Sequence, residues 1–283
     1  MRKVSSVSAG ILTGILILGA AGCDKLKSRD DINKGIAAFK NAKYGDAVEL
    51  FKQAAALDPT NPNARLYLAT SYMSQWIPGA ESPENLAFAS MAKEEFLKVI
   101  EKDPANTTAL ASLASIAYNQ AGSLAPDKKA EKLDEAAGWY KKLIEADPKN
   151  KEAYYSLGVI VWAKWYPVLM TARAELRMKP EDPGPIKDKK VKEELRAKYS
   201  AMVDDGIANL QKALDIDKEY DDAMAYMNLL IRERADLLDS PDEYKKQIEI
   251  ADAWVQKNLD TKKAKAARTP ATGGIVQDAP ASK

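Results

Sequence analysis

Three segments of the chain alternate apolar and polar residues with the period of an amphipathic α-helix, and each ends at an Asp-Pro pair. They are AVELFKQAAALDP at 47–59, AKEEFLKVIEKDP at 92–104 and AAGWYKKLIEADP at 136–148. In each segment a small residue stands four positions before an aromatic one, which places both side chains on one face of a helix. Because proline cannot continue a helix, the pattern predicts three helices that each end at Asp-Pro.

A second apolar segment follows each Asp-Pro pair: ARLYLATSY at 64–72, ALASLASIAY at 109–118 and AYYSLGVIVW at 153–162. Asn61, Asn106 and Asn150 stand before these segments, and asparagine caps a helix by accepting a hydrogen bond from a free backbone amide. Each D-P-x-N sequence is therefore predicted to be a turn between two helices. The prolines at 59, 104 and 148 lie 45 and then 44 residues apart, a period typical of stacked repeats.

These positions resemble the tetratricopeptide repeat, a pair of helices of about 34 residues. The resemblance covers about residues 28–258 and rests on small, aromatic and helix-ending positions, among them Gly35, Ala47, Phe51, Ala92, Phe96, Leu157 and Gly158. It implies an all-α solenoid of about five helix pairs, in which the first helix of each pair lines a concave groove. It also implies that the groove binds an extended segment or a helix of a partner protein.

The period of 44 to 45 exceeds the usual repeat length, and the surplus falls between the two helices of repeats two and three, at 75–88 and 120–133. Both inserts contain Gly followed by Pro and then return to a helical pattern, so the second helix is predicted to start about six residues early. Repeat four carries a longer insert at 163–201. Its residues 180–185 are predicted to form an irregular loop between two helical arms.

Transferring the groove positions of the family to this sequence gives the candidates for partner binding: Phe39, Thr70, Met73, Ser115, Tyr118, Asn119, Tyr155 and Trp162. Trp165 is added because it stands with Trp162 and Tyr166 in an aromatic group at the start of the fourth insert. The alternative for this group is a place in the core between the two arms.

The N-terminus has the layout of a secretory signal, with basic Arg2 and Lys3, an apolar stretch at 4–18, and small residues before Cys23. It resembles a bacterial lipoprotein signal, in which the cysteine is lipidated and becomes the first residue. The expected organisation is a signal peptide at 1–22, a lipid-anchored tether at 23–30, a solenoid at 31–258 and a disordered tail at 259–283. The resemblance places the protein at the bacterial cell envelope, facing the periplasm or the exterior. The alternative is an uncleaved membrane helix.

The amino-acid composition limits the ligands and reactions that this chain can be expected to support. The chain of 283 residues has 42 Lys and Arg against 41 Asp and Glu, which disfavours a nucleic-acid partner. It has no histidine and one cysteine, so the commonest catalytic base and metal ligand are missing and a structural zinc site is excluded. No Gly-rich phosphate loop occurs. We therefore expect a non-catalytic protein without a metal or cofactor. The alternative is an envelope enzyme or enzyme subunit acting on cell-wall glycan or peptide through acids of the fourth insert.

Overall fold

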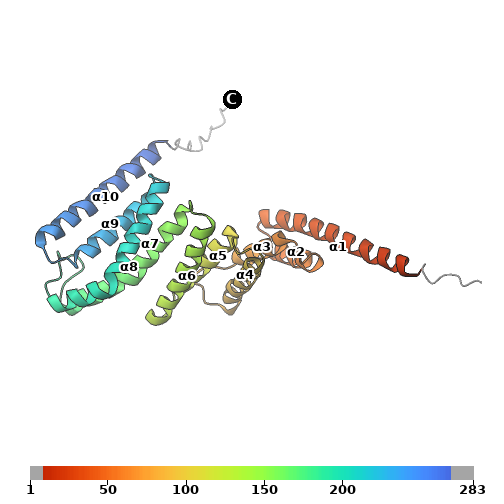
Figure 1. The fold of residues 1–283 in the computed structure, drawn as a ribbon, viewed down its shortest axis with the longest axis horizontal. Coiled ribbons are helices and arrows are strands. Elements are labelled where there is room, and N and C mark those ends of the chain that lie inside the picture. The colour runs from red at the N-terminus through yellow and green to blue at the C-terminus, as the bar shows by residue number, and fades with distance from the viewer. Residues whose placement is uncertain (1–8, 269–283) are drawn as a thin grey trace, which may run out of the picture. The chain divides into compact units, whose positions relative to one another are not determined.

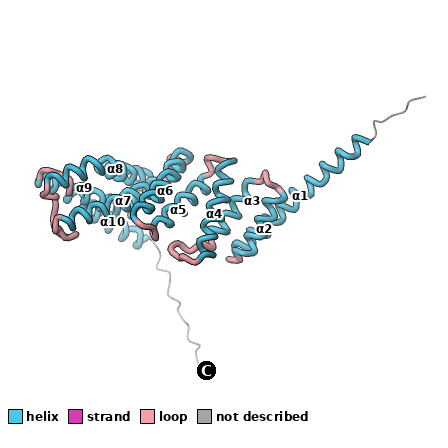
Figure 2. The backbone as a smooth tube through the Cα atoms, turned by 90° about the horizontal axis from the view of Figure 1, so that it is seen from below, coloured by secondary structure: helices cyan, strands magenta, loops and turns pink. Residues whose placement is uncertain are grey.

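The computed structural model describes residues 9–268, and every regular element in that range is an α-helix (Figures 1 and 2). The helices are α1 (Ala9–Lys40), α2 (Tyr44–Leu57), α3 (Pro62–Met73), α4 (Pro83–Lys102), α5 (Thr107–Ala121), α6 (Pro126–Ala146), α7 (Lys151–Glu175), α8 (Lys189–Ile216), α9 (Asp221–Ala235) and α10 (Pro241–Arg268). They pack in adjacent pairs, which confirms the all-α solenoid architecture. The chain divides into two compact units, residues 1–148 and 149–283.

In the first unit each helix from α1 to α6 packs against the next. The small and aromatic residues predicted to share a helix face do so in the core: Ala47 and Phe51 are buried, as are Ala92 and Phe96. A Cβ atom on Gly35 would lie 2.6 Å from the Phe51 ring, so only glycine lets α1 approach α2 this closely. Repeated burial of one stripe against the neighbouring helix holds the stack together.

The D-P-x-N turns have the predicted structure. Asn61, Asn106 and Asn150 each accept a hydrogen bond from a backbone amide in the first turn of the following helix, at 3.0, 3.1 and 3.0 Å. The aspartate before each proline is the C-cap of the preceding helix. In the first turn, the Asp58 carboxylate also accepts a hydrogen bond from the Thr60 amide at 3.1 Å.

The inserts of repeats two and three lengthen the second helix, as predicted. Helices α4 and α6 have 20 and 21 residues, whereas α2 has 14. Both long helices begin at the proline of the insert, Pro83 and Pro126, and proline is well tolerated in the first turn because its missing amide would have no partner there.

The segment expected to be a lipid-anchored tether, residues 23–30, is helical in the structure. Residues 24–30 belong to α1, and Ser28 is fully buried, with its hydroxyl donating to the Ala54 carbonyl at 2.9 Å. This segment is therefore part of the first helix pair instead of an extended link. Of the helices in the described part of the chain, none combines the length and the apolar character needed to span a bilayer. The first eight residues of the expected signal peptide lie outside the described range.

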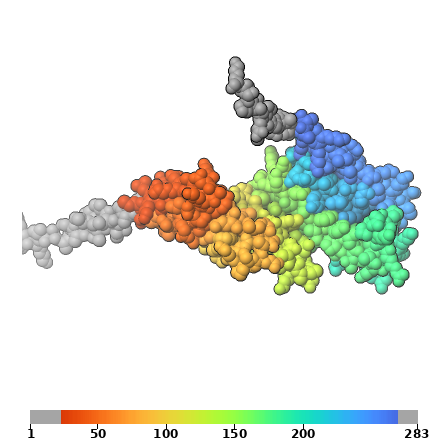
Figure 3. All heavy atoms as spheres, turned by 180° about the vertical axis from the view of Figure 1, so that it is seen from behind, coloured from red at the N-terminus to blue at the C-terminus, as the bar shows by residue number. Residues whose placement is uncertain are grey.

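The second unit contains α7 to α10, in which each helix packs against the next and α7 also contacts α9 (Figure 1). Its core is formed by apolar residues of all four helices, among them Trp165, Leu210, Met224, Leu230 and Ala251. A Cβ on Gly158 would lie 2.5 Å from Leu210, so glycine again sets the separation of two paired helices. Helix α10 lies at the surface of this unit (blue in Figure 3).

The fourth insert forms two helical arms, the end of α7 and the start of α8, joined by an irregular segment at 176–188. This agrees with the prediction. The segment is fixed by the buried Arg173, whose guanidinium donates to the carbonyls of Lys179 and Asp182 at 2.9 and 2.5 Å. The same guanidinium forms a 2.5 Å ion pair with Asp236, so the loop is tied to the end of α9.

The helical part of the chain extends beyond the predicted end of the solenoid at residue 258. Helix α10 continues to Arg268, although residues 259–268 were expected to be disordered. The polar side of this stretch is bound to the α8–α9 turn: Lys265 pairs with Asp221, and Arg268 forms two 2.8 Å hydrogen bonds with Glu219. These contacts stabilise a segment that has no strong apolar stripe, which is why periodicity missed it. Residues 269–283 lie outside the described range.

Candidate functional site

The predicted groove residues of the first unit lie on α1, α3 and α5 and are all partly exposed: Phe39, Thr70, Met73, Ser115, Tyr118 and Asn119. Several are already engaged within the unit. The Thr70 hydroxyl donates to the Leu66 carbonyl at 2.8 Å, and the Asn119 amide donates to the Ser115 carbonyl at 2.8 Å. Phe39 and Met73 pack against the core with one side. This surface offers apolar and neutral polar contacts but no charged side chain.

In the second unit an aromatic row runs over α7 and α9. We define it by Tyr220, Tyr155, Tyr226, Trp162 and Tyr166, whose successive ring centroids are 5.1, 5.7, 5.5 and 5.0 Å apart. Tyr155, Trp162 and Tyr166 share a face of α7 because they are spaced by seven and four residues. Tyr226 reaches from α9 and meets both Tyr155 and Trp162 edge-on. All five rings are partly exposed.

Trp165 does not belong to this row, and its assignment to partner binding is wrong. Its side chain is fully buried, and its ring lies 5.4 Å from that of Tyr199 on α8. It therefore packs in the core between the two helical arms, which was the alternative considered from sequence. Residues three positions apart lie close together on a helix, so the different exposure of Trp162 and Trp165 comes from α8, which covers Trp165.

A buried carboxyl group lies beneath the row. Glu233 on α9 is 8% exposed, and its Oε1 accepts a hydrogen bond from the Trp162 indole at 2.9 Å. Its Oε2 has no hydrogen-bond partner in the described structure. Burial raises the pKa of this carboxyl to about 8, with a further contribution from nearby Asp236. Glu233 is therefore protonated at neutral pH, and it fixes the orientation of Trp162.

Tyr226 and Glu233 are not among the binding residues predicted from the sequence. They are seven residues apart on α9 and so share a helix face, and this spacing was the available signal. It was missed because the fifth repeat has Met227 and Asn228 where Leu and Gly are usual in the family, so the family pattern is weak there.

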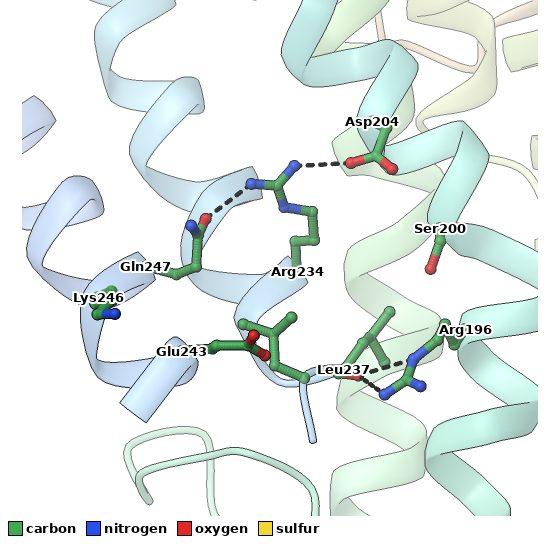
Figure 4. A pocket seen from close by; sticks show the side chains of 9 residues that line it. Arg196, Ser200, Asp204, Arg234, Leu237, Glu243, Lys246 and Gln247 are labelled. Carbon is green, nitrogen blue, oxygen red and sulfur yellow. Dashed lines mark hydrogen bonds and ion pairs between the residues drawn. The ribbon is translucent and has the colours of Figure 1, made fainter. Parts of the chain in front are cut away.

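A hollow of about 440 Å³ lies where α8, α10 and the α9–α10 turn meet (Figure 4). Two of its charged groups, Arg234 and Asp204, are paired with each other. Arg234 donates to Asp204 and to Gln247, each at 2.8 Å, and Arg196 donates to the Leu237 carbonyl (Figure 4). These contacts fasten the α9–α10 turn to α8. The hollow is thus explained by the packing of the last helix pair.

Two acids of the fourth insert, Asp182 and Asp188, have structural partners. The Asp182 carboxylate accepts a hydrogen bond from the Lys179 amide at 2.7 Å, and Asp188 caps α8 by accepting from the Val191 amide at 2.9 Å. Among the described residues, no group of three or more His, Cys, Asp or Glu side chains could hold a metal ion. Cys23 is exposed at the start of the described side chains.

Comparison with known proteins agrees with this architecture. Residues 38–75, which span the first D-P-x-N turn, match the family described as tetratricopeptide repeat. The crystal structure of MamA protein has a TM-score of 0.54 and 15% sequence identity, covering 88% of this chain and 98% of that chain. MamA residues 41 to the end from Desulfovibrio magneticus RS-1 gives a TM-score of 0.52 at 15% identity, covering 84% of this chain and 96% of that one. No curated protein sequence matches the chain. Residues 38–75 therefore match a tetratricopeptide repeat, and the similarity to the MamA structures extends to the helical fold of the chain.

Proposed function

We propose that this protein is a non-catalytic scaffold that binds a segment of another protein along the aromatic row and is held to a bacterial envelope membrane by lipid on Cys23. The observation that carries the binding proposal is the row itself. It places four partly exposed aromatic side chains on the first helices of two successive repeats and a fifth, Tyr220, at the N-cap of the second of these helices. Tyr and Trp dominate the binding energy of protein interfaces because they combine a large apolar area with few rotatable bonds.

The aromatic row is also rigid in the absence of a bound partner. Each ring is held by its neighbours, and Trp162 is further oriented by Glu233. A preformed surface loses little side-chain entropy on binding, so more of the contact energy remains as affinity. The partner that suits the row is an extended segment or one face of a helix carrying apolar or aromatic side chains.

The membrane part of the proposal is supported by the sequence of the N-terminus, where a basic start and an apolar stretch precede small residues and Cys23. Mass spectrometry of the protein isolated from its native membrane tests it. We expect residue 23 at the N-terminus with acyl chains attached, and a Cys23→Ser variant should lose this modification.

A partner pull-down tests the binding proposal. The full-length chain is recovered from detergent extracts of the source cells after mild crosslinking, and the result is compared with that for the Tyr155→Ala/Trp162→Ala double variant. We expect one stoichiometric partner that the double variant loses. The matched control is Trp139→Ala, which removes a partly buried tryptophan of the first unit.

Equal recovery of the partner by the double variant would remove the aromatic row as the site. Loss of the partner supports the site only if circular dichroism shows that the double variant is still folded, because both side chains also contact the core of the unit. Turnover of isolated cell wall by the purified protein, abolished by one Asp or Glu substitution, would favour an enzyme instead.

A further inference from the structure

The inserts of repeats two and three meet in space. A hollow of about 220 Å³ lies between them, lined by Trp76, Gly79, Ala80, Glu81 and Leu86 of the first insert and by Asn119, Gln120, Ser123, Leu124 and Lys132 in and around the second. An apolar cavity of about 150 Å³ is enough to bind a benzene molecule, so this hollow has room for a large aliphatic side chain. The departures from the usual repeat length thus create a pocket in the first unit.

The loop that forms one wall is fixed by a buried side chain. Asn85 accepts a hydrogen bond from the Ile77 amide at 2.7 Å and donates to the carbonyls of Ile77 and Ala80, both at 2.8 Å. Gly79 completes the turn with a φ of 83°, in the region that favours glycine. The pocket wall is therefore preformed, which lowers the entropy lost on binding.

This rigid loop presents apolar side chains to solvent. Ile77 is 66% exposed and Leu86 is 49% exposed, while the neighbouring Trp76 is buried in the core. The three hydrogen bonds of Asn85 hold the loop in a conformation that leaves Ile77 exposed to solvent. This exposure does not stabilise the fold. Exposed apolar patches next to a hollow are typical of interaction surfaces.

Charge at the rim selects the occupant. Lys132 is already paired with Glu135 at 2.6 Å, and Glu135 also binds Lys93 at 2.6 Å. Glu81 is exposed, and no ion pair of the described structure uses its carboxylate. The free charge beside the apolar pocket is thus negative, and it favours a basic residue on the partner.

We infer that the pocket between the two inserts is a second docking site, which takes a Leu, Ile or Met side chain of a partner segment that carries a Lys or Arg beside it. The site lies in the first unit and the aromatic row lies in the second, so each can be tested while the other is intact. It gives the enlarged repeats a role that the stacking of helices alone does not require.

Peptide selection tests this inference. Random 12-residue peptides displayed on phage are first depleted on the Leu86→Asp variant and then selected on the full-length chain in mild detergent. We expect the enriched peptides to share a large aliphatic residue next to a basic one. Synthetic versions should bind the Leu86→Asp variant at least about tenfold more weakly than the unmodified chain. The matched control is Leu259→Asp, because Leu259 on α10 is equally exposed, at 48%, and its substitution should leave the affinity unchanged.

Charge reversal provides a second test that does not disturb apolar packing. Selection on the Glu81→Lys variant should replace the basic residue of the enriched peptides with Asp or Glu. Enrichment without an aliphatic residue, an unchanged charge preference with Glu81→Lys, or equal affinity for the Leu86→Asp variant would each overturn the inference. So would a dimer in sedimentation equilibrium that Ile77→Asp dissociates, since a second copy would then cover this face.

Discussion

Replacing Gly158 by alanine tests whether close helix approach holds the second unit together. Gly158 lies on α7 against α8, and a Cβ there would come within 2.5 Å of Leu210 Cγ and 2.7 Å of its Cδ2. Leu210 is fully buried, so it cannot turn aside into solvent. The two helices must separate, or Leu210 must leave its rotamer.

The size of the effect follows from two opposing terms. Inserting a methyl group into a packed core costs about 1–3 kcal/mol. Alanine in place of glycine within a helix recovers up to about 1 kcal/mol. We therefore expect Gly158→Ala to lower the free energy of unfolding by roughly 1–2 kcal/mol, and to lower Tm by a few degrees.

The measurement is urea unfolding followed by circular dichroism, with Gly138→Ala as the matched control. Gly138 is also inside a helix, α6, but no atom lies within 4 Å of the position its Cβ would take. That variant should gain about 0.5–1 kcal/mol, because only the helix propensity changes. Equal gains in both variants would refute the reasoning, since the contact with Leu210 would then impose no cost.

Three further results are expected from urea unfolding. Arg173→Met should cost about 3–5 kcal/mol at pH 7, because Asp236 keeps a buried charge without its partner and the 176–188 segment loses its anchor; a loss below 1 kcal/mol would show that the pair is not needed, and Lys189→Met at an exposed pair is the control. Glu233→Gln should become more stable than the unmodified chain as pH rises from 4.5 to 8, because the folded carboxyl keeps its proton up to about pH 8 while the unfolded one loses it near 4.5. The difference should vanish below pH 4.5 and reach on the order of 4 kcal/mol at pH 8, and a difference independent of pH would contradict the burial argument. Asn106→Ala should cost about 1 kcal/mol through loss of the cap on α5, whereas no change would mean that water replaces it.

The fold could be predicted from sequence because its main signals are local. A residue such as Asn106 caps the helix that it precedes, and Ala92 shares a face with Phe96 whatever the neighbouring helices do. These relations depend on helix geometry alone. The end of α10 could not be found in this way, because Arg268 is held by Glu219, 49 residues away in the sequence.

The aromatic row was only partly predictable for a related reason. Trp162 and Trp165 are both aromatic and stand three positions apart, so composition and spacing treat them alike. Their solvent exposure differs because α8 covers Trp165 with Tyr199, whereas α9 binds Trp162 through Glu233. Which side of α7 each helix covers is a tertiary property that one segment does not encode.

The pocket between the inserts shows what a repeat pattern can and cannot predict. Trp76 and Ala121 are 45 residues apart, one full period, and equivalent positions of successive repeats are neighbours in a stack. This period agrees with the contact between the two inserts that the structure shows. It did not imply a hollow, because that depends on Asn85 folding back to hold the backbone at Ile77 and Ala80. These hydrogen bonds join residues eight and five positions apart, a contact that the helical period does not specify.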